Sequence, residues 1–274
     1  MLNNISSTSP LASIITIVLN GEADIRRTIE SVLGQSYPNI EYIVIDGGSE
    51  DNTIPIIREY ESQIAHFQSE KDAGISDGFN RGIRLASGAI IGLINAGDWY
   101  SSNAVESVVE LFQKNGDLGV LCGALQFYKG KEKEYCCFSE PRLLKRDMSV
   151  THPSCFVRSE LYARFGDFSN QYKLAMDYEL LLRFKVNGAQ FMATQTVFAN
   201  MEHDGISEEN WQDALAETHR ARSELLGNSF YAGRIYYIFL VCKRKVRMFL
   251  ERAGAESVLA FYRSKLALVK KHKT

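Results

Sequence analysis

Cysteine is scarce in this sequence, and the few cysteines are not arranged in pairs. The 274 residues include five of them, an odd number, and no C-x-x-C spacing occurs. A disulfide framework is therefore excluded as the basis of the fold, and we expect free thiols in a reducing compartment. The adjacent Cys136 and Cys137 are predicted to be packing residues rather than a redox pair. The five cysteines are Cys122, Cys136, Cys137, Cys155 and Cys242.

Targeting segments, repeats and long apolar runs are absent as well. Residues 1–10 are polar and lack the basic and apolar regions of a signal peptide, so we expect a cytosolic protein. The apolar run of residues 235–242 is far shorter than the ~20 residues that a membrane-spanning helix needs. With 45% hydrophobic and 23% charged residues, the composition is that of a globular protein. We predict one main domain, residues 1–228, and a helical tail, residues 229–274.

The net charge of -2 hides a strong asymmetry between these two parts. Residues 1–228 carry 20 Lys and Arg against 31 Asp and Glu, whereas residues 229–274 carry 11 against 2. A basic tail indicates an anionic partner, and no recognition motif for nucleic acid accompanies it. Two interpretations stay open. The tail either lies on an anionic membrane surface as an amphipathic anchor, or it docks on the body or on a second copy in a homodimer.

The main domain begins with compact apolar runs that alternate with segments of helical periodicity. This alternation predicts an α/β fold with parallel strands, crossover helices and a sheet covered on both faces. After Trp99 the pattern becomes mixed and predicts an antiparallel extension, so we divide the domain into halves of about 13–100 and 101–228. Expected strands are 13–19, 40–45, 64–68, 89–94, 120–128, 134–138 and 191–198, and expected helices include 25–33, 51–60, 76–86, 103–114, 159–165, 177–186 and 208–226.

Polar residues follow each of the first four expected strands. They are Asn20, the segment Asp46-Gly47-Gly48-Ser49, the segment Glu70-Lys71-Asp72, and the segment Asn95-Ala96-Gly97-Asp98. One such strand end is typical of a turn or helix cap. Parallel strands, however, bring their carboxyl ends to one edge, where ligands of α/β proteins bind. Four polar ends together therefore predict a ligand site.

The segments QSYPNIEYIVIDGGSEDNT, SEKDAGISDGFNRGIRLASG and LINAGDWY, between Gln35 and Tyr100, occur in the order found in family 2 glycosyltransferases, which the sequence resembles. The resemblance implies a GT-A fold and a nucleotide-sugar donor. It places Asp46 in the pocket of a pyrimidine base, whose imide N–H needs an acceptor. It also places Leu19 where the family often has a stacking aromatic residue, and Asp72 at the nucleotide pocket.

LINAGDWY lies where this family carries an acidic motif that binds a divalent cation. Gly97 replaces one acid of that motif, and Asp98 remains, with Asn95 three residues before it on the donor side. Mg2+ or Mn2+ often takes one or two protein carboxylates and completes its shell with diphosphate oxygens and water. Asp98 is thus the predicted metal ligand. Arg81 is a candidate for stabilising the leaving diphosphate, and a solvated helix residue is the equally weighted alternative.

The resemblance also implies a catalytic base for direct displacement with inversion at the anomeric carbon. Asp177, in YKLAMDYELLL, matches the family's base, although an aspartate before a helix also serves as a cap. His152, in Thr151-His152-Pro153-Ser154, is an acceptor-side candidate, and its alternative is a buried histidine. His203 lies where the family often has a glycine-containing loop over the donor, and its alternative is a loop residue without a ligand.

The resulting hypothesis is a non-processive glycosyltransferase that acts in the biosynthesis of bacterial surface polysaccharides such as capsule or lipopolysaccharide. It would move one sugar from a UDP-sugar to a lipid-linked or glycan acceptor at the inner face of the cell membrane. The Q-x-x-R-W element of processive relatives is missing. A sugar-nucleotide pyrophosphorylase would need a glycine-rich basic loop, which Asn20-Gly21-Glu22-Ala23 does not provide. A catalytically weak scaffold that binds nucleotide sugar or a partner glycosyltransferase is the remaining alternative.

Overall fold

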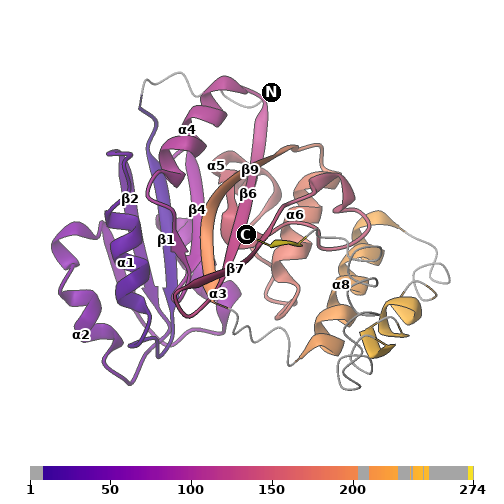
Figure 1. The fold of residues 1–274 in the computed structure, drawn as a ribbon, viewed down its shortest axis with the longest axis horizontal. Helices are drawn as coiled ribbons and strands as arrows, with labels where there is room; N and C mark the ends of the chain where they lie inside the picture. The colour runs from indigo at the N-terminus through magenta and orange to yellow at the C-terminus, as the bar shows by residue number, and fades with distance from the viewer. Residues whose placement is uncertain are drawn as a thin grey trace.

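The computed structural model describes residues 9–202, 210–227, 235, 237–242, 244–246 and 271–273. A ten-stranded sheet runs through the centre of the molecule, and helices flank it (Figure 1). The strands are β1 (Ala12–Val18), β2 (Ile40–Asp46), β3 (His66–Ser69), β4 (Ile90–Asn95), β5 (Trp99–Tyr100), β6 (Leu118–Lys129), β7 (Glu132–Cys137), β8 (Cys155–Arg158), β9 (Gln190–Glu202) and β10 (Lys271–Lys273). The helices are α1 (Ile25–Leu33), α2 (Thr53–Arg58), α3 (Ile75–Leu85), α4 (Ala104–Lys114), α5 (Ser159–Phe165), α6 (Met176–Val186) and α8 (Trp211–Leu226).

The sheet joins a parallel half to a mostly antiparallel half. The order is β10-β7-β6-β8-β4-β1-β2-β3, and β9 pairs with both β5 and β6. Strands β1 to β4 are parallel where they pair, whereas β8 is antiparallel to both of its neighbours, β4 and β6. The predicted antiparallel extension after Trp99 is therefore confirmed. Its parallel β6–β9 pair was not expected.

Alternate residues of the central strands enter two separate cores, one on each face of the sheet. Ile15 and Ile17 of β1 face the core that contains α3, α5 and α6. Ile14 and Val18 face the core that contains α1 and α4. All four side chains are at most 9% exposed, which explains why the strand reads as one continuous apolar run.

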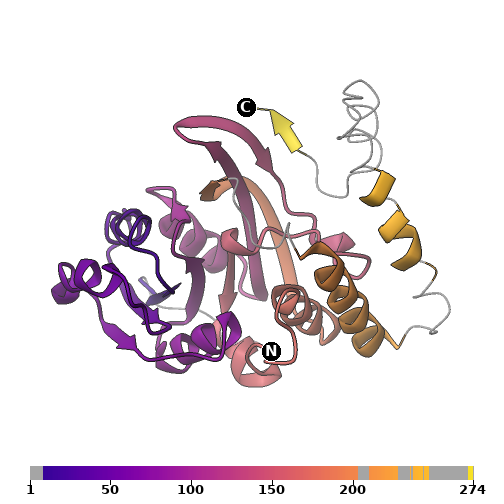
Figure 2. The same cartoon turned by 90° about the horizontal axis from the view of Figure 1, so that it is seen from below.

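On one flank of the sheet, α6 and α8 lie side by side, as two views at right angles show (Figures 1 and 2). Helix α8 contributes Ala221, which is fully buried, to the core beneath α6. Among the residues that the structure describes, every helix is too short or too polar to traverse a lipid bilayer. All five cysteines are free thiols, as predicted, and four of them are buried.

A close approach of α3 to β1 gives a test of this packing. A Cβ atom at Gly82 would lie 2.3 Å from Cγ2 of Ile15, which is fully buried. Gly82→Ala is therefore expected to lower the free energy of unfolding by about 1–3 kcal/mol through overpacking, although alanine favours a helix. Denaturant unfolding measures this. As a control, Ser62→Ala, at an exposed residue before β3, should change stability by less than about 1 kcal/mol. Equal stability of Gly82→Ala and the parent chain would contradict the packing.

Candidate active site

The four polar strand ends meet at one edge of the sheet, as the sequence predicts. In the parallel register, Val18 of β1 lies beside Asp46 of β2, and Ile17 lies beside Asn95 of β4. Asp46 in turn lies beside Ser69, the last residue of β3. The loops that follow these strands therefore start from a common edge, and a ligand placed there can touch several of them.

Hydrogen bonds join the loops after β1 and β2 into one wall. The N–H of Asn20 donates to Ser49 Oγ (2.7 Å), and the N–H of Glu50 donates to Asn20 Oδ1 (2.9 Å). Asn20 has φ of 50°, a left-handed conformation that asparagine tolerates better than most residues. Leu19 is 58% exposed at this wall, so its side chain can meet a ligand. Further bonds of the same kind join Gly21 to Thr53 and Glu22 to Asn52.

Asp46 is completely buried, and its carboxylate is used inside the loop after β2. Oδ2 accepts hydrogen bonds from the N–H groups of Gly48 and Ser49 (both 3.0 Å) and from Ser69 Oγ (2.7 Å), and Oδ1 accepts one from Ser49 Oγ (2.5 Å). Three of these donors share Oδ2, whereas Oδ1 accepts from the Ser49 hydroxyl alone and keeps acceptor capacity. Asp46 therefore shapes the loop from within, and its direct bond to a base stays a prediction.

Asp72, between β3 and α3, packs its carboxylate against bare glycine backbone. A Cβ at Gly47 would lie 2.6 Å from Asp72 Oδ2, and a Cβ at Gly78 would lie 3.4 Å from the same atom. Oδ1 accepts the N–H of Gly74 (3.0 Å). The carboxylate therefore occupies the space that a side chain at position 47 would otherwise take, at the edge where β2 ends.

Arg81 holds the loop that carries Asp72. Its guanidinium donates to the carbonyl oxygens of Glu70 (3.2 Å) and Lys71 (3.1 Å) and lies 3.6 Å from the Asp77 carboxylate. The side chain is only 13% exposed, so the alternative of a solvated helix residue is wrong. Contact between Arg81 and a leaving diphosphate stays a prediction.

Asp98, just after β4, is a buried carboxylate with an unsatisfied oxygen. The residue is 3% exposed, and its Oδ2 has no hydrogen-bond partner. Burial raises the pKa of Asp98 to about 7, and the charge of Arg27 acts in the opposite direction. Gly97 has φ of 103°, a conformation that strongly favours glycine, which explains why no second acid stands there. Asn95 is half-buried, and its carbonyl closes the turn by accepting the Asp98 N–H (3.1 Å).

The surroundings of Asp98 fit a divalent cation that is coordinated mainly by a bound phosphate compound and by water rather than by protein side chains. An unpaired buried carboxylate oxygen needs a proton or a cation, because burying it alone is costly. Within the described residues no group of three or more His, Cys, Asp or Glu side chains comes together to hold a metal. A cation bound by Asp98 would therefore take most of its other ligands from phosphate oxygens and water.

Arg27, which was not among the residues predicted from the sequence, fixes the loop of Asp98 from the side. Its guanidinium donates to the carbonyl of Gly97 (2.9 Å) and to Glu202 Oε1 (2.5 Å), and its Cζ lies 4.1 Å from the centre of the Trp99 ring. Gly97 and Glu202 are 70 and 175 residues away from Arg27 in sequence. No local pattern identifies such a residue, because Arg27 lies on the polar side of an ordinary amphipathic helix.

Asp177, the predicted base, lies in the first turn of α6, with His152 close by. The His152 ring packs edge-on against Phe79 and Phe168, with ring centres 6.0 and 5.9 Å away. Burial lowers the pKa of His152, and the nearby negative charge of Asp177 acts in the opposite direction. The two acceptor-side candidates therefore lie within electrostatic reach of each other. His203 lies outside the described residues.

Helix α3 connects the donor side of the site to the segment before Asp177. The side chain of Asn80 donates to the carbonyl of Phe168 and accepts its N–H, both at 2.9 Å. Ser76 Oγ donates to Met176 Sδ (3.0 Å), next to Asp177. The loop of Asp72 and the residue Asp177 are therefore attached to the same helix.

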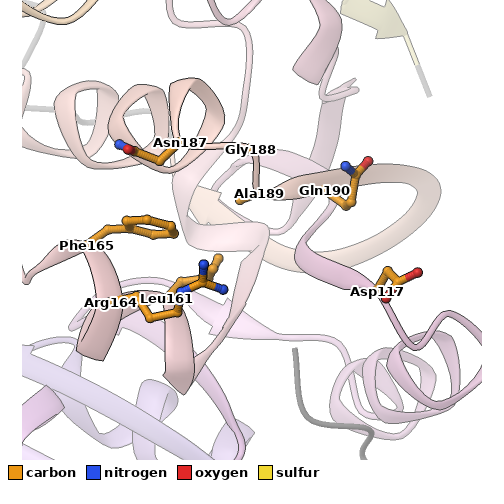
Figure 3. Close-up of a pocket in the computed structure, with 8 residues that line it drawn as sticks. All are labelled: Asp117, Leu161, Arg164, Phe165, Asn187, Gly188, Ala189 and Gln190. Carbon is orange, nitrogen blue, oxygen red and sulfur yellow. The ribbon is translucent and has the colours of Figure 1, made fainter. Parts of the chain in front are cut away.

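A separate pocket of about 340 Å³ opens at the other end of α6 (Figure 3). Asp117, Arg164 and Asn187 line it together with Phe165 and the start of β9. Asn187 follows the last residue of α6, whereas Asp177 lies in the first turn. Eleven helical residues span roughly 16 Å, so this pocket is distinct from the candidate active site.

Comparison with known proteins decides the family. The profile of "Glycosyl transferase family 2" matches residues 13–159, more than half of the chain. The protein belongs to glycosyltransferase family 2. The match spans the four strand ends and stops before Asp177. This family 2 glycosyltransferase is 33% identical to "Uncharacterized glycosyltransferase Rv1514c" of Mycobacterium tuberculosis, over 65% of this chain and 70% of that protein. It is 24% identical to a "PGL/p-HBAD biosynthesis glycosyltransferase" of Mycobacterium bovis, over 66% and 72%.

Solved structures confirm the expected GT-A fold of this glycosyltransferase. S. aureus TarS 1-349 in complex with UDP-GlcNAc aligns with a TM-score of 0.65 at 16% identity, over 94% of this chain and 76% of that one. The mannosyltransferase PcManGT from Pyrobaculum calidifontis, in complex with GDP-Man and Mn2+, aligns with a TM-score of 0.63 at 15% identity, over 83% and 67%. At these identities the likeness concerns the fold alone.

Proposed function

We propose that this family 2 enzyme is an inverting, metal-dependent and non-processive transferase that moves one sugar from a nucleotide sugar to an acceptor hydroxyl. The observation that carries the proposal is the buried, unpartnered Oδ2 of Asp98 at the edge where the polar strand ends meet. Structures of TarS with UDP-GlcNAc and of PcManGT with GDP-Man and Mn2+ support this donor chemistry.

In this proposal, the chain's own residues bind the donor and move one proton. Leu19 and Asn95 flank the donor, while Asp46 and Arg81 hold the loops that enclose it. Asp177 accepts the proton of the acceptor hydroxyl as that oxygen attacks the anomeric carbon. A divalent cation at Asp98, Mn2+ or Mg2+, would supply charge stabilisation of the departing diphosphate.

Asp72 is proposed as an acceptor for the imide N–H of the base beside Asp46, because Asp46 is completely buried and accepts four hydrogen bonds within its own loop. Asp72 Oδ2 lies at the end of β2 and has no hydrogen bond in the described structure. A carboxylate there favours bases with an imide N–H, such as uracil, over cytosine, whose ring nitrogen has no proton. This supports a UDP-sugar as the donor.

Asp72→Asn is expected to weaken UDP binding by roughly 10- to 100-fold, because a hydrogen bond to a charged acceptor contributes ~1.5–3 kcal/mol. Binding of a cytidine nucleotide should change by less than that. Calorimetry with both nucleotides measures the difference. Asp117→Asn, the same substitution in the separate pocket, is the matched control. An equal loss for both nucleotides would reject the role of Asp72 in base recognition.

For the acceptor, we propose a lipid-linked or glycan hydroxyl in surface polysaccharide or glycolipid biosynthesis, reached from the cytoplasmic face of the membrane. The named role of the mycobacterial PGL/p-HBAD relative supports this class.

Residues 1–228 would form the catalytic unit and residues 229–274 a basic, amphipathic membrane anchor. In the described part of the tail, Ile235, Ile238 and Val246 are 69%, 52% and 52% exposed, next to the exposed Lys245. The tail also touches the body, since Tyr237 packs on His219 and Arg244 on Trp211.

Truncation after residue 228 is expected to abolish co-sedimentation with vesicles that contain anionic phospholipid, and to leave UDP binding unchanged. The untruncated chain should bind such vesicles and not neutral ones, and binding should fall as salt rises. Ile238→Ser removes one exposed apolar side chain and should weaken vesicle binding partially. Undiminished binding of the truncated chain would reject the anchor, and a concentration-dependent dimer that disappears on truncation would favour the homodimer interpretation.

Calorimetric titration with UDP, GDP, CMP and dTDP, each with Mn2+ and with EDTA, tests the donor proposal. Metal-dependent binding of UDP is the expected result. Preference for GDP would keep the transferase proposal and change the donor class. Absence of binding for all four nucleotides would reject it and favour a scaffold without catalysis.

A further inference from the structure

Helix α8 holds the segment that leads into Asp177, and it does so through a single carboxylate. Glu217 accepts hydrogen bonds from the backbone N–H groups of Lys173 (3.0 and 3.1 Å), Leu174 (2.8 Å) and Ala175 (2.9 Å). These three donors directly precede α6, which begins at Met176 and has no side-chain cap of its own. Glu217 therefore caps α6 from outside, across more than forty residues of sequence.

The electrostatics of this contact favour an ionised Glu217. Burial alone would raise its pKa, but the three backbone donors and the charge of Arg220 outweigh burial and lower it. A negative charge at the amino end of a helix is also stabilised by the helix dipole. Hydrogen bonds to a charged acceptor are stronger than those between neutral groups, so this cap is a firm attachment.

Neighbouring contacts from α8 hold other parts of the segment. Glu224 accepts the hydroxyl of Tyr172 (2.6 Å), and Arg220 donates to the carbonyl of Gln171 and stacks over the Tyr172 ring at 4.2 Å. Among the described residues of α8, Glu217 is the one whose side chain accepts hydrogen bonds from residues 173–175, which lie within four positions of Asp177. Arg220 and Glu224 therefore hold residues 171 and 172, whereas Glu217 holds the last three residues before α6.

Resting on the proposed function, in which Asp177 is the base, we infer that Glu217 is a positioning residue that sets the place and orientation of the Asp177 carboxylate. It touches neither donor nor acceptor in this assignment. Its three bonds fix the backbone from which α6 starts, and thereby the first turn that carries Asp177. A misplacement of about 1 Å at a reacting group can cost ~100-fold in rate.

Glu217→Gln is the test, because the amide keeps the shape but loses the charge and faces the backbone donors with an N–H group of its own. We expect kcat to fall roughly 10- to 100-fold, with the KM for donor and the calorimetric affinity for UDP within about threefold of the parent. Glu224→Gln, on the same helix and facing the same segment, is the matched control and should keep kcat within about threefold. Equal losses in both variants would reduce Glu217 to a general docking contact and overturn the inference.

A double-mutant cycle separates positioning from folding. In an Asp177→Asn background, Glu217→Gln should change the residual rate by less than about threefold, because a residue that acts through Asp177 has nothing left to position. A further 10-fold or larger loss in that background would overturn the inference. If Glu217→Gln does not fold, Glu217→Asp, which keeps the charge on a shorter chain, replaces it with the same expected pattern.

Amide hydrogen exchange tests the contact without any activity. Exchange at residues 173–177 should accelerate in Glu217→Gln and stay unchanged in Glu224→Gln, and unaltered exchange in Glu217→Gln overturns the inference whatever the turnover. Accelerated exchange together with a wild type that transfers no sugar would instead reject the proposed function, and with it the catalytic half of the inference. The two failures are therefore distinguishable.

Discussion

Replacing Asp177 by asparagine is expected to lower kcat by roughly 10²- to 10⁴-fold, the usual contribution of a general base. The amide cannot accept the acceptor's proton, whereas the donor pocket lies on the strand ends of the other half and stays intact. Affinity for UDP with Mn2+ should therefore remain within about threefold of the parent. Steady-state transfer assays and calorimetry on the same preparation measure both quantities.

Asp117→Asn is the matched control for this change. It is the same substitution at the opposite end of α6, in the separate pocket, and should leave kcat unchanged. Combined loss of turnover and of nucleotide binding in Asp177→Asn would count against a base and in favour of a structural role at the helix start.

The second large effect is expected at Asp98. Asp98→Asn should abolish the difference between UDP binding with Mn2+ and with EDTA, a loss of roughly 100-fold if the cation contributes several kcal/mol at the diphosphate. Binding in EDTA should match the parent chain. Thermal stability without metal should not fall, because a neutral amide replaces a buried carboxylate whose Oδ2 has no partner.

Asp24→Asn provides the control for Asp98. Asp24 lies in the same corner, where it forms a partly exposed ion pair with Arg27 at 3.5 Å. Its substitution removes a charge near the loop without touching the buried oxygen, so metal dependence should persist. Metal dependence retained by Asp98→Asn would place the cation elsewhere and refute the assignment.

The parallel half of the fold was predictable because its information is local. The helix expected at residues 25–33 is observed as α1, Ile25–Leu33, and the first two strands lie within one residue of their expected ends. Buried strands produce continuous apolar runs, and amphipathic helices produce a period of 3.6 residues. The convergence of the strand ends then follows from parallel pairing alone.

Elements that depend on distant partners were not predictable in the same way. Strand β8 has four residues and lies between β4 and β6, a place that its short apolar run does not specify. The two-residue β5 exists because Trp99 and Tyr100 pair with Asn200 and Ala199 of β9.

Within the site, sequence alone identified which residue types gather at the edge of the sheet. It did not show which of their hydrogen-bonding atoms already have partners. Asp46 and Asp72 look alike as aspartates after strands. The structure separates them, because four donors surround Asp46 whereas Asp72 keeps Oδ2 without one. Hydrogen-bond saturation depends on three-dimensional neighbours, such as Ser69 for Asp46, that no local pattern reports.

The hydrogen bonds between the loops after β1 and β2 have a thermodynamic consequence for recognition. Asn20 and Ser49 are already fixed to each other before any ligand arrives, with bonds of 2.7 and 2.9 Å between the two loops. A nucleobase that settles on this wall orders little additional backbone, so that side of the pocket contributes only a small conformational entropy loss on association. The enthalpy of binding should then come chiefly from the contacts that the ligand itself makes with the protein.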